Sequence, residues 1–207
     1  MTWTKQDAIE AIVGYGRRLG YSDQFIQFAL AVSYGESGWN AYAVGDNGQS
    51  FGIFKFYRGG GRGTGIPIET LQDPYYQAKV NLPYLYAAYV KYGGDSGWIA
   101  NPMETFRSAW KYGQGSVWPS DGQLSSALAA VKQLASDQPD IFDPDTKFPD
   151  LPSMSTETVN YDEPADMPSS PSPQAPVWNN WFNPQMWESW FQPQTYGLNM
   201  WPQQQAP

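Results

Sequence analysis

Proline and charge are distributed unevenly along the chain, and this limits the part of it that can fold into a compact domain. Residues 136–207 hold 13 of the 18 prolines and 10 of the 20 acidic residues, against a single Lys147. A segment of this composition cannot bury enough apolar surface to order itself. We therefore expect one domain at 1–136, then an extended acidic, proline-rich linker at 137–177 and an aromatic-rich interaction tail at 178–207.

The first part of the chain has the apolar spacing of a mainly α-helical domain. Thr4 and Asp7 resemble a capping box before a helical run, and Ser22 caps a second run that is apolar on nearly all faces. Such a helix is expected to be central and buried. The spacing predicts further helices at 102–112 and 121–135.

A fifth helix is predicted to begin at Asp73 and Pro74, which have the residue types of an N-cap and a first-turn position. Pro83 should kink or divide it, because proline lacks the N–H that continues the helix. Between the helices, residues 43–56 lose the helical period, and Gly-Asp-Asn-Gly at 45–48 predicts a hairpin or irregular loop. Residues 58–65 are too rich in glycine for regular structure and are expected to be mobile.

The composition excludes several kinds of chemistry. The chain has no cysteine and no histidine, so it has neither a Ser-His-Asp or Cys-His nucleophile nor a His/Cys zinc site, and we expect no metal and no cofactor. A net charge of -8 without a basic stripe makes nucleic acid an unexpected partner. No apolar run has the length of a signal peptide or a transmembrane helix. If the protein is an enzyme, carboxylates are expected to move the protons.

Glu36 is the carboxylate best placed for such a role. It falls at the predicted C-terminal end of the apolar helix, where the helix dipole disfavours a negative charge and Tyr34 and Trp39 could exclude water. Both effects raise the pKa of a carboxyl group. An acid that stays protonated near neutral pH can give a proton to the leaving oxygen of a glycosidic bond.

The residues around Glu36 add a family resemblance. E-S-G-W-N-x-x-A at 36–43, followed by G-D-N-G-Q-S-F-G-I-F-K at 45–55, resembles the lysozyme-like family of soluble lytic transglycosylases and goose-type lysozymes. The family pattern is E-S-x-F-N-x-x-A, then a turn, then G-L-M-Q. Two weaker segments, D-P-Y-Y-Q-A at 73–78 and S-A-W-K-Y-G-Q-G at 108–115, are similar to its later motifs D-P-x-x-N-I and A-x-Y-N-A-G.

The resemblance implies a mainly α, lysozyme-like fold with a small hairpin and assigns Glu36 as the catalytic acid. Asp46 matches an acid of the goose-type turn that is thought to help place a water, although an Asx-turn explains Asp46 without chemistry. Substrate contacts are expected from a set of residues in the three motifs: Ser37, Asn40, Gln49, Ser50, Phe51, Gly52, Phe54, Lys55, Trp110 and Tyr112. Of these, Phe51, Phe54, Trp110 and Tyr112 can equally be packing residues.

Three positions depart from the family pattern. Lys55 replaces its glutamine, Trp110 replaces its tyrosine and Lys111 replaces its asparagine. Lys55 could bind a carboxylate of a peptide stem or could point to solvent. Arg58 and Arg62 could likewise point to solvent, or they could contact anionic peptide stems as part of a lid.

The resemblance implies cleavage of the β-1,4 bond between N-acetylmuramic acid and N-acetylglucosamine in peptidoglycan glycan strands. A lytic transglycosylase would leave a 1,6-anhydro end, and the alternatives are a hydrolytic muramidase using Asp46 and a non-catalytic peptidoglycan-binding or structural virion protein. Because no export signal is expected, a phage protein that travels in the virion or is released during host lysis fits best. Residues 178–207, with Trp187, Trp190 and Phe191 on one face of a short helix, would then dock on another virion protein or on a membrane interface.

Overall fold

A computed structural model describes residues 2–114 and 119–143, without the side chains of Tyr112 and Gln114. The chain divides into two units at Met1–Pro173 and Gln174–Pro207, and the second unit lies wholly outside the described residues. The predictions for the interaction tail at 178–207, and for the linker beyond residue 143, also fall outside the described part and stay predictions.

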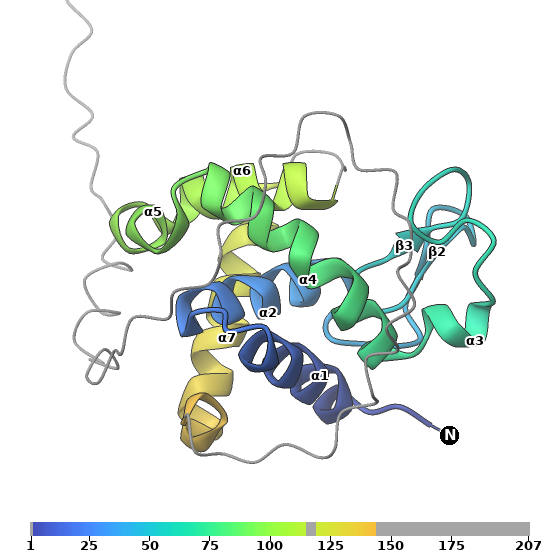
Figure 1. The fold of residues 1–207 in the computed structure, drawn as a ribbon, viewed down its shortest axis with the longest axis horizontal. Helices are drawn as coiled ribbons and strands as arrows, with labels where there is room; N and C mark the ends of the chain where they lie inside the picture. The colour runs from blue at the N-terminus through green and yellow to red at the C-terminus, as the bar shows by residue number, and fades with distance from the viewer. Residues whose placement is uncertain (1, 115–118, 144–207) are drawn as a thin grey trace, which may run out of the picture. The chain divides into compact units, whose positions relative to one another are not determined.

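The described domain is mainly helical with one small antiparallel sheet, as the sequence predicts (Figure 1). Helix α4 packs against α1 on one side and α6 on the other, and α2 packs against α1 and α7. In chain order the elements are α1 (Lys5–Arg18), α2 (Asp23–Ser37), β1 (Val44–Gly45), β2 (Ser50–Phe51), β3 (Phe56–Tyr57), α3 (Ile68–Leu71), α4 (Pro74–Lys91), α5 (Gly94–Ala100), α6 (Pro102–Gln114), α7 (Asp121–Asp137) and the 3-10 helix η1 (Pro139–Phe142).

Local capping explains where the main helices begin. The Thr4 hydroxyl accepts from the Asp7 N–H while the Asp7 carboxylate accepts from the Thr4 N–H, which completes the predicted capping box of α1. The Ser22 hydroxyl accepts from the Phe25 N–H at the start of α2. At α4, the Asp73 carboxylate accepts from the N–H groups of the first turn, beside Pro74 at the first helical position. These three helix starts are confirmed.

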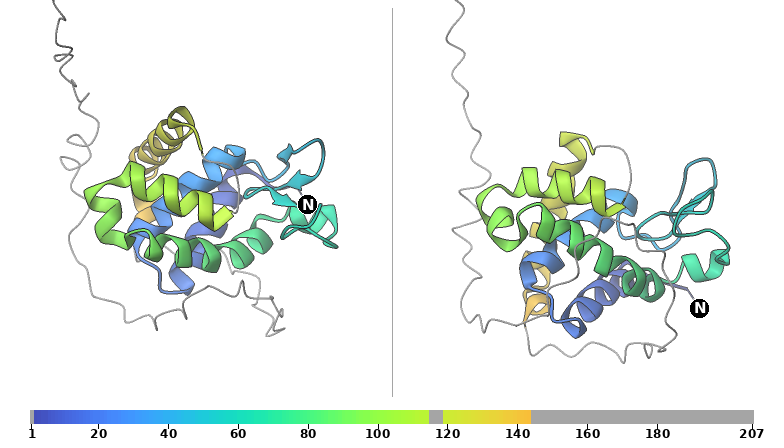
Figure 2. Two further views of the ribbon diagram at one scale, coloured as in Figure 1. Left: turned by 90° about the horizontal axis from the view of Figure 1, so that it is seen from above. Right: turned by 45° about the horizontal axis from the view of Figure 1, so that its top comes forward.

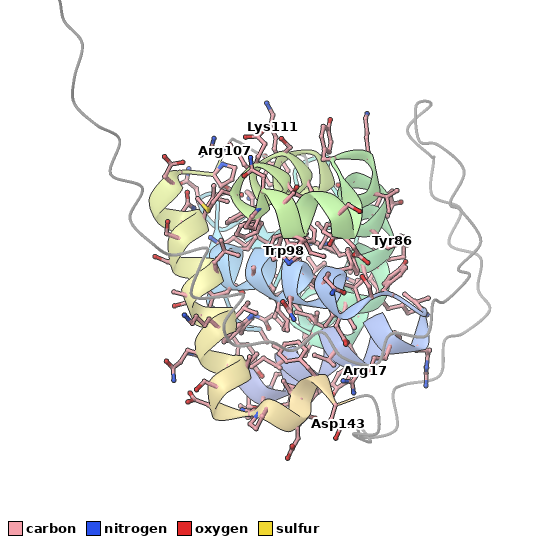
Figure 3. The ribbon with its side chains drawn as sticks, turned by 90° about the vertical axis from the view of Figure 1, so that its left-hand side faces the viewer. Arg17, Tyr86, Trp98, Arg107, Lys111 and Asp143 are labelled. Atoms are coloured by element: carbon pink, nitrogen blue, oxygen red, sulfur yellow. The ribbon has the colours of Figure 1, made fainter. Side chains whose placement is uncertain are left out.

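Helix α2 is central, as its apolar composition predicts. Nine consecutive residues, from Phe25 to Ser33, are buried. Phe28 on this helix contacts the rings of Tyr89, Trp98 and Phe106, which come from α4, α5 and α6. Trp98 lies between α2 and the layer formed by α5 and α6 (Figure 3). This aromatic core packs against α2 around Phe28.

The strands and α3 lie together at one side of the helices, beyond the C-terminal end of α2 (Figures 1 and 2). Val44 pairs with Phe51, and Phe51 pairs with Phe56, in a three-stranded sheet of order β1-β2-β3. Asp46 and Asn47 have φ of 49° and 55°, so the predicted Gly-Asp-Asn-Gly segment forms the tight turn between β1 and β2. The predicted hairpin is therefore present, with a third short strand added.

Residues 58–65 contain no helix or strand, as predicted, and their predicted mobility stays a prediction. Arg62 connects this loop to the helices: it donates to Asn81 Oδ1 at 2.6 Å and to the Gly113 carbonyl at 2.8 Å, and it lies over the Tyr84 ring. One boundary prediction is wrong. The predicted linker begins later than residue 137, because η1 buries Ile141 and Phe142 against the domain. Arg17 donates to the Ile141 carbonyl at 3.0 Å, and Arg17 and Asp143 lie at the same end of the domain (Figure 3).

Two helices add to the predictions. Of the two outcomes predicted for Pro83, a kink or a division of the helix, the division is wrong, because α4 continues through this proline, which lies on its exposed side. Helix α5 was not predicted, since G-D-S-G-W-I-A has no helical apolar period. It forms because Trp98 is buried, and because Asp95 accepts hydrogen bonds from the Ser22 and Tyr89 hydroxyls. Within the described residues, no helix is long and apolar enough to cross a membrane.

Candidate active site

The candidate site is built around Glu36, in the last turn of α2. The helix ends at Gly38, which adopts the left-handed conformation with φ 63°, and Trp39 follows with φ 61°. The Trp39 indole N–H donates to the Leu30 carbonyl at 2.9 Å, and its ring packs edge-on against Tyr34. Trp39 is therefore fixed to α2 on one side of Glu36, in contact with Tyr34 on the other side.

Trp110 of α6 holds the Glu36 carboxyl group. Its indole Nε1 donates to Glu36 Oε1 at 2.6 Å. Only 2% of Trp110 is exposed, and its ring stacks on Phe106 at 5.2 Å. The Trp110 ring is thus enclosed by protein and offers no open face to a sugar. The structure therefore supports a packing role for this ring and not stacking on a substrate.

Gly35 allows this contact between α2 and α6. A methyl group placed on Gly35 would lie 2.0 Å from Trp110 Cη2, far inside the distance that two carbon atoms tolerate. Gly35 lies in the last turn of α2, directly before Glu36. A glycine within a helical run is the signal that could have indicated close packing here.

Burial raises the pKa of the Glu36 carboxyl group, because the charged form loses hydration. The hydrogen bond from Trp110 and the positive charge of Lys55 act in the opposite direction, and the negative charge of Asp46 adds to the rise. The net direction is upward. The shift of the Glu36 pKa is in the direction that a general acid requires, and Lys55 and Asp46 are close enough to influence it electrostatically.

The turn that faces Glu36 is fixed to α2 by two serines. Ser33 and Ser37 both donate to the Ile53 carbonyl, at 3.2 and 3.1 Å, and Ser37 also donates to the Ser33 carbonyl. Ser37, predicted to contact substrate, thus has a structural role next to Glu36. Ile53 is fully buried.

Gln77 of α4 holds the other side of this turn. Its Nε2 donates to the carbonyls of Phe51 and Leu71, both at 2.7 Å, and its Oε1 accepts from the Phe54 N–H at 2.7 Å. The Gln77 side chain is fully buried, and Gly52 lies directly against it. No role was predicted for Gln77 from the sequence. Gln77 lies in the weak D-P-Y-Y-Q-A motif, at the position of the asparagine in the D-P-x-x-N-I motif that this segment resembles.

The remaining predicted residues lie in or beside this turn. Asp46 is exposed and accepts a hydrogen bond from the buried Ser50 hydroxyl. Lys55 is partly buried beside Gly45. Phe51 and Phe54 are buried in the core, so their side chains are not presented to a ligand, and the Phe51 carbonyl and the Phe54 N–H are bonded to Gln77.

Other candidates are not brought to Glu36 by any described contact. Asn40 is exposed and its side chain accepts from the Tyr42 N–H at 2.9 Å, which is a local turn. Gln49 is exposed, and its carbonyl accepts from the Arg58 N–H. Lys111 lies on the outer side of α6 (Figure 3), and the Tyr112 side chain is outside the described part.

Comparison with protein-family models, with curated proteins and with solved structures gives no significant match to this chain.

Proposed function

We propose that this protein is a peptidoglycan lytic transglycosylase of the lysozyme-like superfamily. One observation carries the proposal: a partly buried glutamic acid with a raised pKa ends the central helix, and Trp110 Nε1 holds one of its oxygens at 2.6 Å. A carboxyl group whose pKa is raised by burial and whose orientation is fixed in this way is suited to protonating a glycosidic oxygen. The motif residues around Glu36 give the substrate class by resemblance.

The chemistry assigns two successive proton transfers to Glu36. With Oε1 engaged by Trp110, the other oxygen donates its proton to the leaving oxygen as the bond to C1 of N-acetylmuramic acid breaks. The carboxylate then takes the proton of the 6-hydroxyl of the same sugar while that oxygen bonds to C1. The products are a free 4-hydroxyl and a 1,6-anhydro end, and no water is consumed.

Hydrolysis is the second candidate, since Asp46 supplies a further carboxylate whose charge reaches Glu36. In an inverting glycosidase the second carboxylate activates a water on the opposite face of the sugar. Here the Asp46 carboxylate already accepts a hydrogen bond from Ser50 within its own turn. This local role favours the transglycosylase over the muramidase.

Product analysis tests the proposal. The full chain is incubated with purified peptidoglycan, and the soluble fragments are analysed by mass spectrometry; anhydro ends are expected. If the fragments have reducing ends alone, the protein is a hydrolase and not a transglycosylase. If it binds peptidoglycan without solubilising any of it, the protein is a non-catalytic peptidoglycan-binding or virion protein.

Glu36→Gln is expected to lower activity about 10³-fold, within the usual contribution of a general acid. Glu69→Gln, which changes an exposed carboxylate on α3, is the matched control and is expected to retain activity. A fully active Glu36→Gln variant would show that Glu36 is not the catalytic acid.

We also propose that the protein acts from a phage virion or is released during host lysis. The support is the resemblance to wall-degrading enzymes and the aromatic composition of residues 178–207. Deleting residues 170–207 should abolish incorporation into virions while activity on peptidoglycan remains. Unchanged incorporation would contradict a docking role for this segment.

A further inference from the structure

Lys55 occupies an unusual position in the turn between β2 and β3. Its N–H donates to the Gly52 carbonyl at 3.2 Å, and its φ of 46° lies in the left-handed region, which disfavours residues other than glycine. A lysine in this conformation costs free energy relative to glycine. Such backbone strain tends to persist where the side chain has a functional task.

The Lys55 side chain lies across the backbone of Gly45. A methyl group placed on Gly45 would be 3.4 Å from Lys55 Cδ and Cε and 3.3 Å from Nζ. The absence of a side chain at Gly45 therefore leaves room for the aliphatic part of the lysine. The Lys55 ammonium group thereby lies beside the backbone of Gly45, the residue before Asp46, and its positive charge acts on the Glu36 carboxyl group.

Among the described residues, no carboxylate lies within 4.0 Å of the Lys55 ammonium group. The ion pairs found there connect Arg107 with Glu104 and with Asp121. The nearest acid in sequence, Asp46, accepts instead from Ser50. Burial favours the neutral form of Glu36. A partly buried ammonium group with three donors therefore lies beside the proposed acid without a carboxylate partner from the described chain.

We propose that Lys55 is a specificity-determining residue that binds a carboxylate of the substrate next to the bond that is cleaved. This inference rests on the proposed function and defines its substrate as an anionic glycan, in contrast to neutral chitin-type chains. The carboxylate is carried on the lactyl side of N-acetylmuramic acid. It belongs either to the lactyl group itself, where the peptide stem is absent, or to the stem.

A binding experiment tests this without requiring turnover. Dissociation constants are measured by calorimetry in the Glu36→Gln background for three soluble ligands of equal sugar length. These are a peptidoglycan tetrasaccharide with stems, the same tetrasaccharide after an amidase has removed the stems, and neutral chitotetraose. The measured quantity is the preference, the ratio of the chitotetraose Kd to the Kd of each anionic ligand.

Lys55→Gln is expected to lower this preference about tenfold, as for the loss of one hydrogen bond to a charged group. Raising the salt concentration should lower it in the same direction. Lys91→Gln removes an equal charge from the exposed last turn of α4 and should leave the preference unchanged. If Lys55→Gln lowers the preference only for the ligand with stems, Lys55 binds a carboxylate of the stem. If it lowers the preference for both anionic ligands, Lys55 also binds the lactyl carboxylate when that group is free.

An unchanged preference in Lys55→Gln, or no binding of any of the three ligands, would overturn the proposal. Lys55→Gly adds a readout that separates recognition from folding. Glycine suits the left-handed conformation, so this variant should melt no lower than the parent and should still lose the preference. A lower melting temperature with an unchanged preference would show that Lys55 is structural.

The two proposals fail separately. If the wild-type chain binds anionic fragments through Lys55 but solubilises no peptidoglycan, the enzyme assignment falls and recognition by Lys55 stands. If it cleaves peptidoglycan and Lys55→Gln leaves the preference unchanged, the enzyme assignment stands and this inference falls.

Discussion

The two halves of the candidate site are built in different ways. The helical half consists of Glu36, Gly35 and Trp110, and it is held by close packing of α2 against α6. The turn half consists of residues 45–55, and it is held by side-chain hydrogen bonds from Ser33, Ser37 and Gln77 to backbone groups. The acid thus lies in a packed environment, while the residues expected to meet substrate lie on polar supports.

This difference suits the tasks that we propose for the two halves. A general acid needs a partly dehydrated place and one orientation, which dense packing provides. A sugar-binding turn needs backbone groups in fixed positions near solvent, which a buried glutamine and two serines can provide without covering the surface. Changes to each half should therefore have distinct signatures.

The largest expected effect comes from the polar support. Gln77→Leu keeps the volume but leaves the Phe51 carbonyl, the Leu71 carbonyl and the Phe54 N–H without their buried partner. Each unsatisfied buried group costs about 1–3 kcal/mol, and we expect a total loss of about 3 kcal/mol in the free energy of unfolding. Urea denaturation measures it.

Gln133→Leu is the control, because it removes an amide that is exposed and bonded to Asp137 on α7. Its effect should stay within about 0.5 kcal/mol. Equal losses in the two variants would mean that the turn does not depend on Gln77, and the contrast between the two halves would disappear.

The next effect comes from the packed half. Gly35→Ala should displace Trp110 and lower the free energy of unfolding by about 2 kcal/mol, because the new methyl group would overlap the indole ring. Trp110→Phe in the same chain should recover part of the loss, since the smaller ring frees the space. Thermal denaturation of the single and double variants checks this, and additive losses would contradict the contact.

Gly122→Ala is the matched control for Gly35→Ala. Gly122 lies in the first turn of α7 and is exposed, with only the Ser120 hydroxyl 4.0 Å from an added methyl group. This substitution is expected to stabilise the protein by up to about 1 kcal/mol through helix propensity.

The smallest effect concerns the charge of Glu36. Its pKa is raised on folding, so the folded state favours the neutral form and stability falls as pH rises from the unfolded pKa, about 4.3, through the folded pKa. Glu36→Gln removes this penalty and can still accept from Trp110. The variant should therefore be more stable than the wild type at pH 7 and nearly equal to it at pH 3.

Melting temperatures of both proteins between pH 3 and 8 measure this difference. Glu69→Gln, on the exposed side of α3, should show no such pH-dependent gain. A gain for Glu36→Gln that is constant across the pH range would mean that its charge is not penalised in the folded state.

Sequence reasoning succeeded where structure depends on neighbours in the chain. The starts of α1, α2 and α4 follow from side chains that cap backbone groups two or three residues away. It failed where distant residues decide the conformation. The hydrogen bonds that connect the glycine-rich loop at 58–65 to α4 and α6 through Arg62 were not predicted, and neither was η1, whose apolar side chains are buried.

The sequence by itself determined that Glu36 ends an apolar helix, that a tight turn follows it, and that carboxylates are the groups available for proton transfer at neutral pH. Only the tertiary structure decided which residues meet there. Trp110 is 74 positions from Glu36, and Gln77 is 26 from Phe51, so packing of α2, α4 and α6 was needed to join them. Helix caps act within a few residues, whereas the orientation of the acid depends on contacts that form only when the whole core is assembled.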